Sequence, residues 1–203
     1  MSRYIGPRLR IMRSLGVQLP GLSAKSIERR PQPPGQHGVG KRKTNKSNYA
    51  LRLREKQKVR FNYGLTEGQL RRLVVEATRS KANTAYMLIQ LLERRLDNIV
   101  FRAGLARTIP GARQLVSHGH LLVNGRVCDR PSLRVGRGDV LTVRPSGHPV
   151  ARQALEKGAG HLSPWLETNT DALTVKIVTF PEAAFLPLAL EPRLIIEHFS
   201  RAM

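Results

Sequence analysis

Cysteine, acidic residues and long apolar runs are all scarce in this chain of 203 residues. Its single cysteine, Cys128, excludes an internal disulfide framework and a cysteine-rich zinc site. The apolar runs are much shorter than the roughly 20 residues that span a bilayer, which argues against an integral membrane protein. The N-terminal segment lacks the apolar core of a signal peptide. We therefore expect a soluble protein in a reducing compartment, long enough to bury a core in one domain or two small ones.

The shortage of acidic residues leaves the chain strongly basic. There are 35 Lys and Arg against 14 Asp and Glu, for a net charge of +21. Residues 1–60 carry +14, residues 61–150 carry +8 and residues 151–203 carry −1. No ordinary cytosolic enzyme needs such a charge, so it favours a polyanionic partner, nucleic acid first. The 26 arginines and 9 lysines suit RNA, because a guanidinium binds phosphate and stacks on bases, although a GC-rich genome also raises arginine content.

The first half of the chain predicts an irregular arm followed by helices. Residues 1–47 are basic and rich in Pro and Gly, which predicts a largely irregular arm that is disordered alone and orders on RNA. Spacing and capping residues predict helices at 48–61, from Thr66 onwards, from 84 without a break to Gly104, and at 108–117. The buried face of the second helix is expected to hold Leu70, Leu73, Val74 and Ala77.

The second half changes to the alternation of strands. The dipeptide Asn124-Gly125 predicts a type I′ turn in a hairpin, and a second strand pair is expected to follow it. Strands are predicted at 121–123, 126–128, 133–135, 140–143 and 173–178. Residues 145–163 predict a loop together with a short helix, and the chain ends in an amphipathic stretch around Ile195 and Phe199. We expect Trp165 and Phe199 to lie in the core.

Residues 93–143 form the unit with the clearest chemistry. Two helices that feed a small sheet through a glycine turn would present one face of the shorter helix. Arginine binds phosphate, and amide and imidazole groups bind ribose hydroxyls, as shape-based RNA recognition requires. The residues expected on or close behind this face are Arg107, Arg113, Gln114, His118, His120, Asn124 and Arg126. The alternative is a small α+β domain with a charged surface.

At these residues the unit resembles the α-L RNA-binding motif, and the whole chain resembles the bacterial-type family of small-subunit ribosomal protein four, also called universal small-subunit protein four. The opening is most similar to cyanobacterial and plastid members. The segments that carry the resemblance, in chain order, are residues 2–4, 6–10, 34–38, 91–98, 118–120, 123–125, 164–166 and 195–201. Some members hold zinc through an N-terminal cysteine cluster. Residues 1–47 contain no cysteine, so this chain resembles the zinc-free kind.

The resemblance implies an α+β fold. A helical N-terminal domain, closed by a C-terminal helix, would carry an inserted α-L RNA-binding domain of two helices and a small, mostly antiparallel sheet. The implied divisions are an arm at 1–47, a helical domain at 48–90 plus 190–203, and an insertion at 91–189. The α-L module itself would occupy about 93–150.

The resemblance also implies a function without catalysis, cofactor or metal. Members are structural constituents of the small ribosomal subunit that bind its rRNA directly at a helical junction and nucleate assembly of the subunit body. They contribute to translational accuracy and to the region where mRNA enters. The implied partners are small-subunit rRNA, the neighbouring ribosomal protein five, mRNA and, for some members, their own mRNA. The implied location is the ribosome in a bacterial cytoplasm, or alternatively in plastid stroma.

The residues predicted to contact RNA therefore fall into two groups. In the module they are the seven residues named above. In the arm and first helix they are Arg3, Arg8, Arg10, Arg13, Lys41, Arg42, Lys43, Lys46, Arg52, Arg54 and Lys58. Their common property is a cation that can neutralise backbone phosphate.

Three near-matches suggest other functions. Residues 35–42 nearly fit a P-loop, but Arg42 replaces the Ser or Thr that would hold Mg²⁺. The tripeptide Arg95-Leu96-Asp97 is similar to a motif of RNA pseudouridine synthases; here we expect Asp97 to pair with a nearby arginine, and too little chain remains for a synthase domain. His118 and His120 have metal-ligand spacing without an acidic or thiol partner, so RNA contact or a turn-closing hydrogen bond is expected. A small RNA-modifying enzyme and a free-standing RNA chaperone stay open as alternatives.

Overall fold

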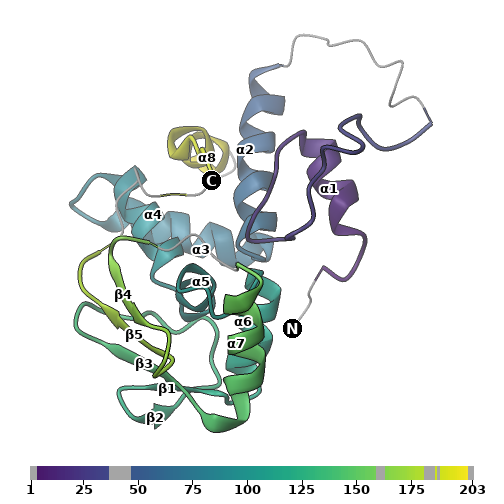
Figure 1. The fold of residues 1–203 in the computed structure, drawn as a ribbon. Helices are drawn as coiled ribbons and strands as arrows, with labels where there is room; N and C mark the ends of the chain where they lie inside the picture. Colours follow the sequence, from purple (N-terminus) through teal and green to yellow (C-terminus); the bar gives the residue numbers. More distant parts are fainter. Residues whose placement is uncertain (1–3, 37–46, 159–162, 181–185, 187, 201–203) are drawn as a thin grey trace.

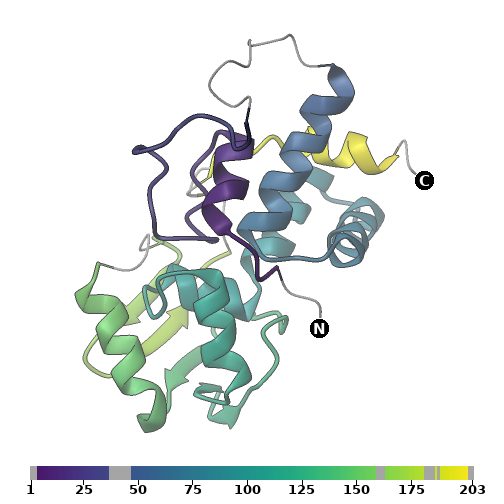
Figure 2. The ribbon, with the colours of Figure 1, turned by 90° about the vertical axis from the view of Figure 1, so that its right-hand side faces the viewer.

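The computed structural model describes residues 4–36, 47–158, 163–180, 186 and 188–200. They form two lobes, one entirely helical and one containing a sheet (Figures 1 and 2). The helices of the first lobe are α1 Arg8–Leu15, α2 Asn48–Asn62, α3 Glu67–Arg79, α4 Thr84–Glu93 and α8 Pro192–Ser200. The C-terminal helix α8 packs against α2 and α4 and so closes the lobe that the N-terminal half begins. This is the predicted α+β arrangement.

Local capping explains where the helices of this lobe begin. The Ser47 hydroxyl accepts a hydrogen bond from the Ala50 N–H at the start of α2. Thr66 and Gln69 form a complete capping box at the start of α3. The predicted face of α3, from Leu70 to Ala77, is buried. In the C-terminal helix, Ile195 and Phe199 are buried, and both Phe199 and Trp165 lie in the core as expected.

Helix α1 was not predicted, and it is a helical segment within an arm that was expected to be largely irregular. Pro7 precedes the helix, and Gly16, with φ of 59°, ends it. The Pro and Gly content that predicted an irregular arm therefore includes the two residues that mark the boundaries of α1. Its apolar face packs in a small second core that includes Leu188 from the far end of the chain. This core contains Ile11, Met12, Leu15, Leu19, Leu22 and Leu188. Residues 16–36 contain no helix or strand.

The predicted continuous helix from residue 84 to Gly104 is wrong, because the chain breaks at Arg94 and Arg95. Helix α4 ends at Glu93, Arg95 is extended with φ −68° and ψ 136°, and α5 occupies Leu96–Arg102. Two N–H groups freed by the break donate to distant carbonyls, Leu96 to Leu133 at 2.8 Å and Asp97 to Pro131 at 3.1 Å. The break is therefore stabilised by hydrogen bonds to a segment about 35 residues later in the chain. The helical spacing of apolar residues contains no signal of such a long-range contact, so it could not predict the break.

The same contacts explain why residues 133–135 do not pair with 140–143. Arg134 makes an isolated bridge with Arg95, and the Val135 N–H donates to the Arg94 carbonyl at 2.9 Å. The backbone groups that a hairpin would need are thus used at the α4–α5 break. The predicted second strand pair is wrong for this reason.

The sheet is antiparallel throughout, with strand order β2-β1-β3-β5-β4. Its strands are β1 Leu121–Val123, β2 Arg126–Val127, β3 Val140–Val143, β4 Leu166–Asn169 and β5 Thr174–Ile177. Asn124 and Gly125 have φ of 50° and 79°, as the predicted type I′ turn requires. Strand β4 was not predicted, because its alternation is polar on both faces except at Leu166.

One face of the sheet is buried beneath helices. Alternate residues of β3 and β5 are buried, among them Leu141, Val143, Val175 and Ile177. Helices α5, α6 Ile109–Ser117 and α7 His148–Glu156 lie on one side of the sheet (Figure 1). Helix α7 is the short helix expected within residues 145–163. In the described part of the chain, no helix is both long and apolar enough to cross a membrane.

Candidate RNA-binding surface

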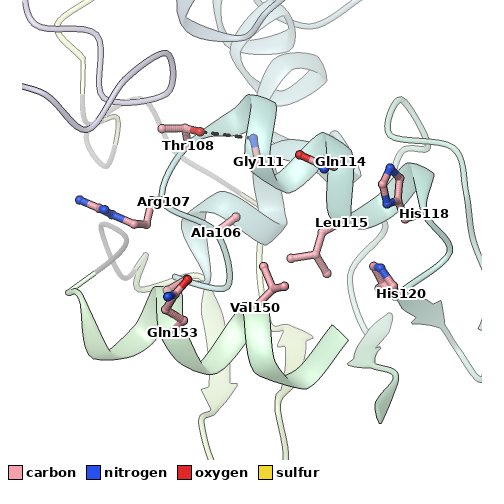
Figure 3. Close-up of a pocket in the computed structure, with 11 residues that line it drawn as sticks. Ala106, Arg107, Thr108, Gly111, Gln114, Leu115, His118, His120, Val150 and Gln153 are labelled. Carbon is pink, nitrogen blue, oxygen red and sulfur yellow. Dashed lines mark hydrogen bonds between the residues drawn. The ribbon is translucent and has the colours of Figure 1, made fainter. Parts of the chain in front are cut away.

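Helix α6 is a short, well-capped helix that presents polar side chains. The Thr108 hydroxyl accepts a hydrogen bond from the Gly111 N–H at 3.3 Å, as Figure 3 shows, and Pro110 lies in the first turn. Gly119, with φ of 70°, turns the chain into β1. Gln114 and His118 are four residues apart and therefore lie on the same face of the helix.

A groove of about 280 Å³ separates α6 from α7. Four of the seven residues predicted for the module line it together (Figure 3). They are Arg107, Gln114, His118 and His120. None of the described residues that line the groove is acidic. The grouping offers a guanidinium for phosphate and amide and imidazole groups for ribose hydroxyls.

The opposite wall of this groove comes from α7 and was missed by sequence analysis. Val150, which is 54% exposed, and Gln153 face the groove from α7 (Figure 3). Their spacing of three residues and the buried Ala151 and Ala154 are helical signals in the sequence. A firm helix prediction at 148–156 would have placed these two side chains on one exposed face.

The two histidines of the groove are near each other but do not form part of a metal cluster. Their ring centroids are 5.9 Å apart, and the His120 ring nitrogen Nδ1 is hydrogen-bonded to the Ser146 hydroxyl at 2.9 Å. Among the described residues, no three His, Cys, Asp or Glu side chains gather closely enough to hold a metal ion. The His120 bond joins the residue before β1 to a residue 26 positions later and does not close the turn at Gly119, so RNA contact by these histidines stays a prediction.

Asn124 and Arg126 lie away from the groove, on the β1–β2 hairpin. The Asn124 amide nitrogen donates to Asp139 Oδ1 at 2.8 Å, and its oxygen accepts from the Val140 N–H at 2.9 Å. Both ends of this side chain therefore hold the hairpin against β3. Arg126 is exposed at the hairpin. RNA contact by either residue stays a prediction.

Arg113 lies on another side of α6 and points into the protein. Its guanidinium contacts Asp97 Oδ2 at 2.6 Å and donates to the backbone carbonyls of Gly64 at 2.8 Å and Tyr63 at 3.3 Å. Asp97 is 1% exposed and also receives two hydrogen bonds from Arg95, at 3.0 and 3.1 Å. The predicted pairing of Asp97 with a nearby arginine is confirmed. Arg113 thus links α6 to the loop between α2 and α3.

A second buried network lies beside this one and was not predicted. Glu93 and Arg102 are both almost fully buried, and the Arg102 guanidinium donates to Glu93 Oε2 at 2.8 Å. The Asn98 amide donates to the same carboxylate at 3.0 Å, and the Tyr63 hydroxyl donates to its other oxygen. Every oxygen of the buried carboxylate therefore has a partner, as burial of a charge requires.

Tyr63 makes this network sensitive to alkaline pH. Burial, and next the negative charge of Glu93, raise the pKa of Tyr63 well above its usual 10.0. The unfolded chain loses this proton at about pH 10, before the folded chain does. The stabilisation is therefore fully present below about pH 10 and is lost as the pH rises further. We expect the free energy of unfolding to fall above about pH 10, and Tyr63→Phe to fall less steeply in urea titrations at matched pH. Equal slopes for the two proteins would contradict this assignment.

The cations predicted in the arm and first helix occupy varied positions. Arg8 and Arg10 are exposed on α1, while the Arg13 guanidinium donates to the Gln32 carbonyl at 2.9 Å. On α2, Arg52 pairs with Glu197 of α8 at 2.9 Å, and Lys58 pairs with Glu55. The Arg54 guanidinium donates to the Leu15 carbonyl at 3.0 Å and so holds α1 against α2. The remaining predicted residues, Arg3, Lys41, Arg42, Lys43 and Lys46, lie outside the described residues.

Two family models together match residues 3–141 of the chain. The family described as "Ribosomal protein S4/S9 N-terminal domain" matches residues 3–93, and the family described as "S4 domain" matches residues 94–141. The two matches meet where α4 ends.

Relatives match over the full length. "Small ribosomal subunit protein uS4" of Methylobacillus flagellatus is 45% identical, with all of both chains covered. The uS4B protein of Nitrosomonas europaea is 46% identical, also over all of both chains. The uS4 protein of Picosynechococcus sp. is 50% identical over 99% of each chain. It is a cyanobacterial relative, of the kind that the opening residues suggested. The chain therefore belongs to the family of the small ribosomal subunit protein uS4.

Proposed function

We propose that this chain is a structural, non-catalytic protein of the small ribosomal subunit that binds the subunit's rRNA directly. The observation that supports this most is the groove between α6 and α7, where Arg107, Gln114, His118 and His120 gather and no described lining residue is acidic. The net charge of +21 supplies the long-range attraction to RNA. Family membership over the full length supports small-subunit rRNA as the partner.

The mechanism we propose is positional. Exposed cations such as Arg8 and Arg10 on α1 would neutralise phosphates of RNA helices that meet at a junction. The α6–α7 groove would read groove shape and 2′-hydroxyls. Because the protein contacts the folded junction better than the open one, binding shifts the RNA toward its folded arrangement.

Finer parts of the proposal rest on family resemblance. They are nucleation of the subunit body, contact with ribosomal protein five and with mRNA where it enters, a contribution to translational accuracy, and binding to its own mRNA. The proposed location is the ribosome of a bacterial cytoplasm. The proposed division of the chain is an arm at 1–47, a helical domain at 48–90 plus 190–203, and an insertion at 91–189.

The proposal is tested by titration of the protein against small-subunit rRNA at physiological salt with excess bulk tRNA. The competitor is needed because a protein of this charge binds any RNA at low salt. We expect a tight, competitor-resistant complex on one region of the rRNA. Binding that tRNA removes would contradict the proposal and favour a general RNA chaperone, while turnover of unmodified rRNA would favour an enzyme.

The same titration tests the groove. We expect the paired substitution Arg107→Gln and Gln114→Ala to weaken binding to the rRNA about tenfold or more, because each lost RNA contact costs roughly 1–3 kcal/mol. Arg152→Gln is the matched control, since Arg152 is exposed on α7 but does not line the groove. Equal loss in both variants would indicate attraction by net charge alone.

A further inference from the structure

A second groove lies between the N-terminal segment, the end of α2 and the start of α6. Its volume is about 440 Å³, within the range of about 300–1,000 Å³ typical of small-ligand sites. The N-terminal segment passes beside α2 near the junction of the two lobes (Figure 2). The residues that line the groove include Tyr4, Ile5, Arg8, Arg60, Phe61 and Gln114. The α6–α7 groove shares only Gln114 with it among the described lining residues, so the two grooves lie on different sides of α6.

Aromatic side chains are concentrated in this groove although they are rare in the chain, at 5% of residues. The Tyr4 ring meets the Phe61 ring edge-on, with centroids 5.7 Å apart and an interplanar angle of 75°. The Arg60 guanidinium lies over the Phe61 ring, 5.2 Å from its centroid. Tyr4 itself is 45% exposed, and the neighbouring Ile5 is 95% exposed. Nearly half of the Tyr4 surface is therefore exposed, and an exposed aromatic ring is a surface on which a base can stack.

The charge of the groove is positive and largely uncompensated. No acidic residue is among the described residues that line it. Arg8 and Arg60 form no ion pair with any described carboxylate; their contacts are with the Leu22 carbonyl and the Gln57 amide, both at 3.4 Å. Arg113 also lines the groove, but Asp97 neutralises it. Two guanidinium groups that pair with no described carboxylate, beside an exposed ring, are complementary to a phosphate joined to a planar base.

The backbone holds Tyr4 in this position. The Tyr4 hydroxyl lies 3.5 Å from the Pro7 carbonyl, so the side chain folds back over Gly6. A Cβ atom at Gly6 would lie 2.7 Å from the Tyr4 hydroxyl oxygen and 2.8 Å from its ring carbon Cζ. Only glycine therefore leaves room for the ring where it lies. The arrangement is specific to the local sequence Tyr4-Ile5-Gly6-Pro7.

We propose that this groove binds one unpaired nucleotide of the RNA, its base stacked on Tyr4 and its phosphate held by Arg8 and Arg60. The base must be unpaired, because the bases of an A-form helix are not accessible for stacking on a side chain. The proposal rests on the proposed rRNA binding and adds to it a site for a single-stranded feature of that RNA. The residues that would stack on the base and hold the phosphate, Tyr4, Arg8 and Arg60, do not line the α6–α7 groove.

Affinity for small-subunit rRNA with excess tRNA is the first test. Tyr4→Ala is expected to weaken binding about tenfold, in line with the roughly 1–3 kcal/mol per stacked base found on alanine substitution. Tyr4→Phe keeps the ring and should bind as wild type does. Gly6→Ala keeps the tyrosine but displaces its ring, so it should lose affinity as Tyr4→Ala does. Tyr86→Ala removes a ring exposed to a similar degree, 39%, outside the groove and should have no effect.

Fluorescence of a Tyr4→Trp variant is the second test and does not depend on affinity. The wild-type protein supplies the background, because its one tryptophan, Trp165, is buried. Stacking of a base on the new indole should quench its emission in the saturated complex, whereas Tyr86→Trp should be unquenched. The proposed nucleotide site is wrong if wild type binds the rRNA, Tyr4→Trp is unquenched and Tyr4→Ala binds as wild type does. The groove would then be available to a protein neighbour. If wild type itself shows no competitor-resistant binding, the proposed function fails and this site with it.

Discussion

Replacing Arg102 with Met is expected to lower the free energy of unfolding by about 3–5 kcal/mol, because a buried charge is left without its partner. Arg102 is 1% exposed and Glu93 is 0% exposed. Methionine fills a similar apolar volume, so the loss reflects the carboxylate rather than a cavity. Tyr63 and Asn98 continue to donate to Glu93, but neither supplies a positive charge.

The measurement is the urea midpoint and the extrapolated free energy of unfolding at neutral pH. Arg134→Met is the matched control, because Arg134 pairs with Glu76 at the surface and such pairs contribute only about 0–1 kcal/mol. The double variant with Glu93→Leu and Arg102→Met should recover much of the loss, since no unpaired charge remains. An Arg102→Met protein within about 1 kcal/mol of wild type would show that the pair does not stabilise the fold in this way.

Replacing Asp97 with Ala should also cost about 3–5 kcal/mol, and more than the loss of either of its cations alone. Asp97 is the shared partner of Arg95 and Arg113, and its removal leaves two guanidinium groups uncompensated. Arg113→Met, in contrast, leaves Asp97 paired with Arg95 and should cost about 1–3 kcal/mol. The expected result is that Asp97→Ala lowers the free energy of unfolding more than Arg113→Met does. Two small losses would indicate instead that Asp97 has only a surface role.

The RNA contact predicted for Arg113 is tested with the same variants. Most donors of this guanidinium are used by Asp97 and by the carbonyls of Tyr63 and Gly64. We therefore expect Arg113→Met to change the free energy of unfolding more than it changes affinity for small-subunit rRNA. Arg107→Gln should do the opposite, because Arg107 is exposed in the α6–α7 groove. A tenfold loss of affinity in a fully folded Arg113→Met protein would restore Arg113 as an RNA contact.

Several features that sequence analysis predicted correctly depend on residues close together in the chain. The capping box of Thr66 and Gln69, the Asn124-Gly125 turn and the buried face of α3 involve neighbours within one or two helical turns. The net charge and the run of cations also follow directly from composition. The resemblance, carried by segments from residue 2 to residue 201, indicated the family before any contact was known.

The features that it missed depend on residues far apart in the chain. The break between α4 and α5 is stabilised by backbone bonds to residues 131–135, and α1 is stabilised by a core that includes Leu188. Arg113 and Arg107 are equivalent as cations in the sequence, yet one pairs with Asp97 and the other faces a groove. Long-range packing and the pairing of buried charges therefore decide which cations can bind RNA. A buried guanidinium must pair within the fold, because an unpaired buried charge is costly, whereas an exposed one stays hydrated and can bind phosphate. Charge, caps and turns, in contrast, are properties of local residue chemistry and can be read without the fold.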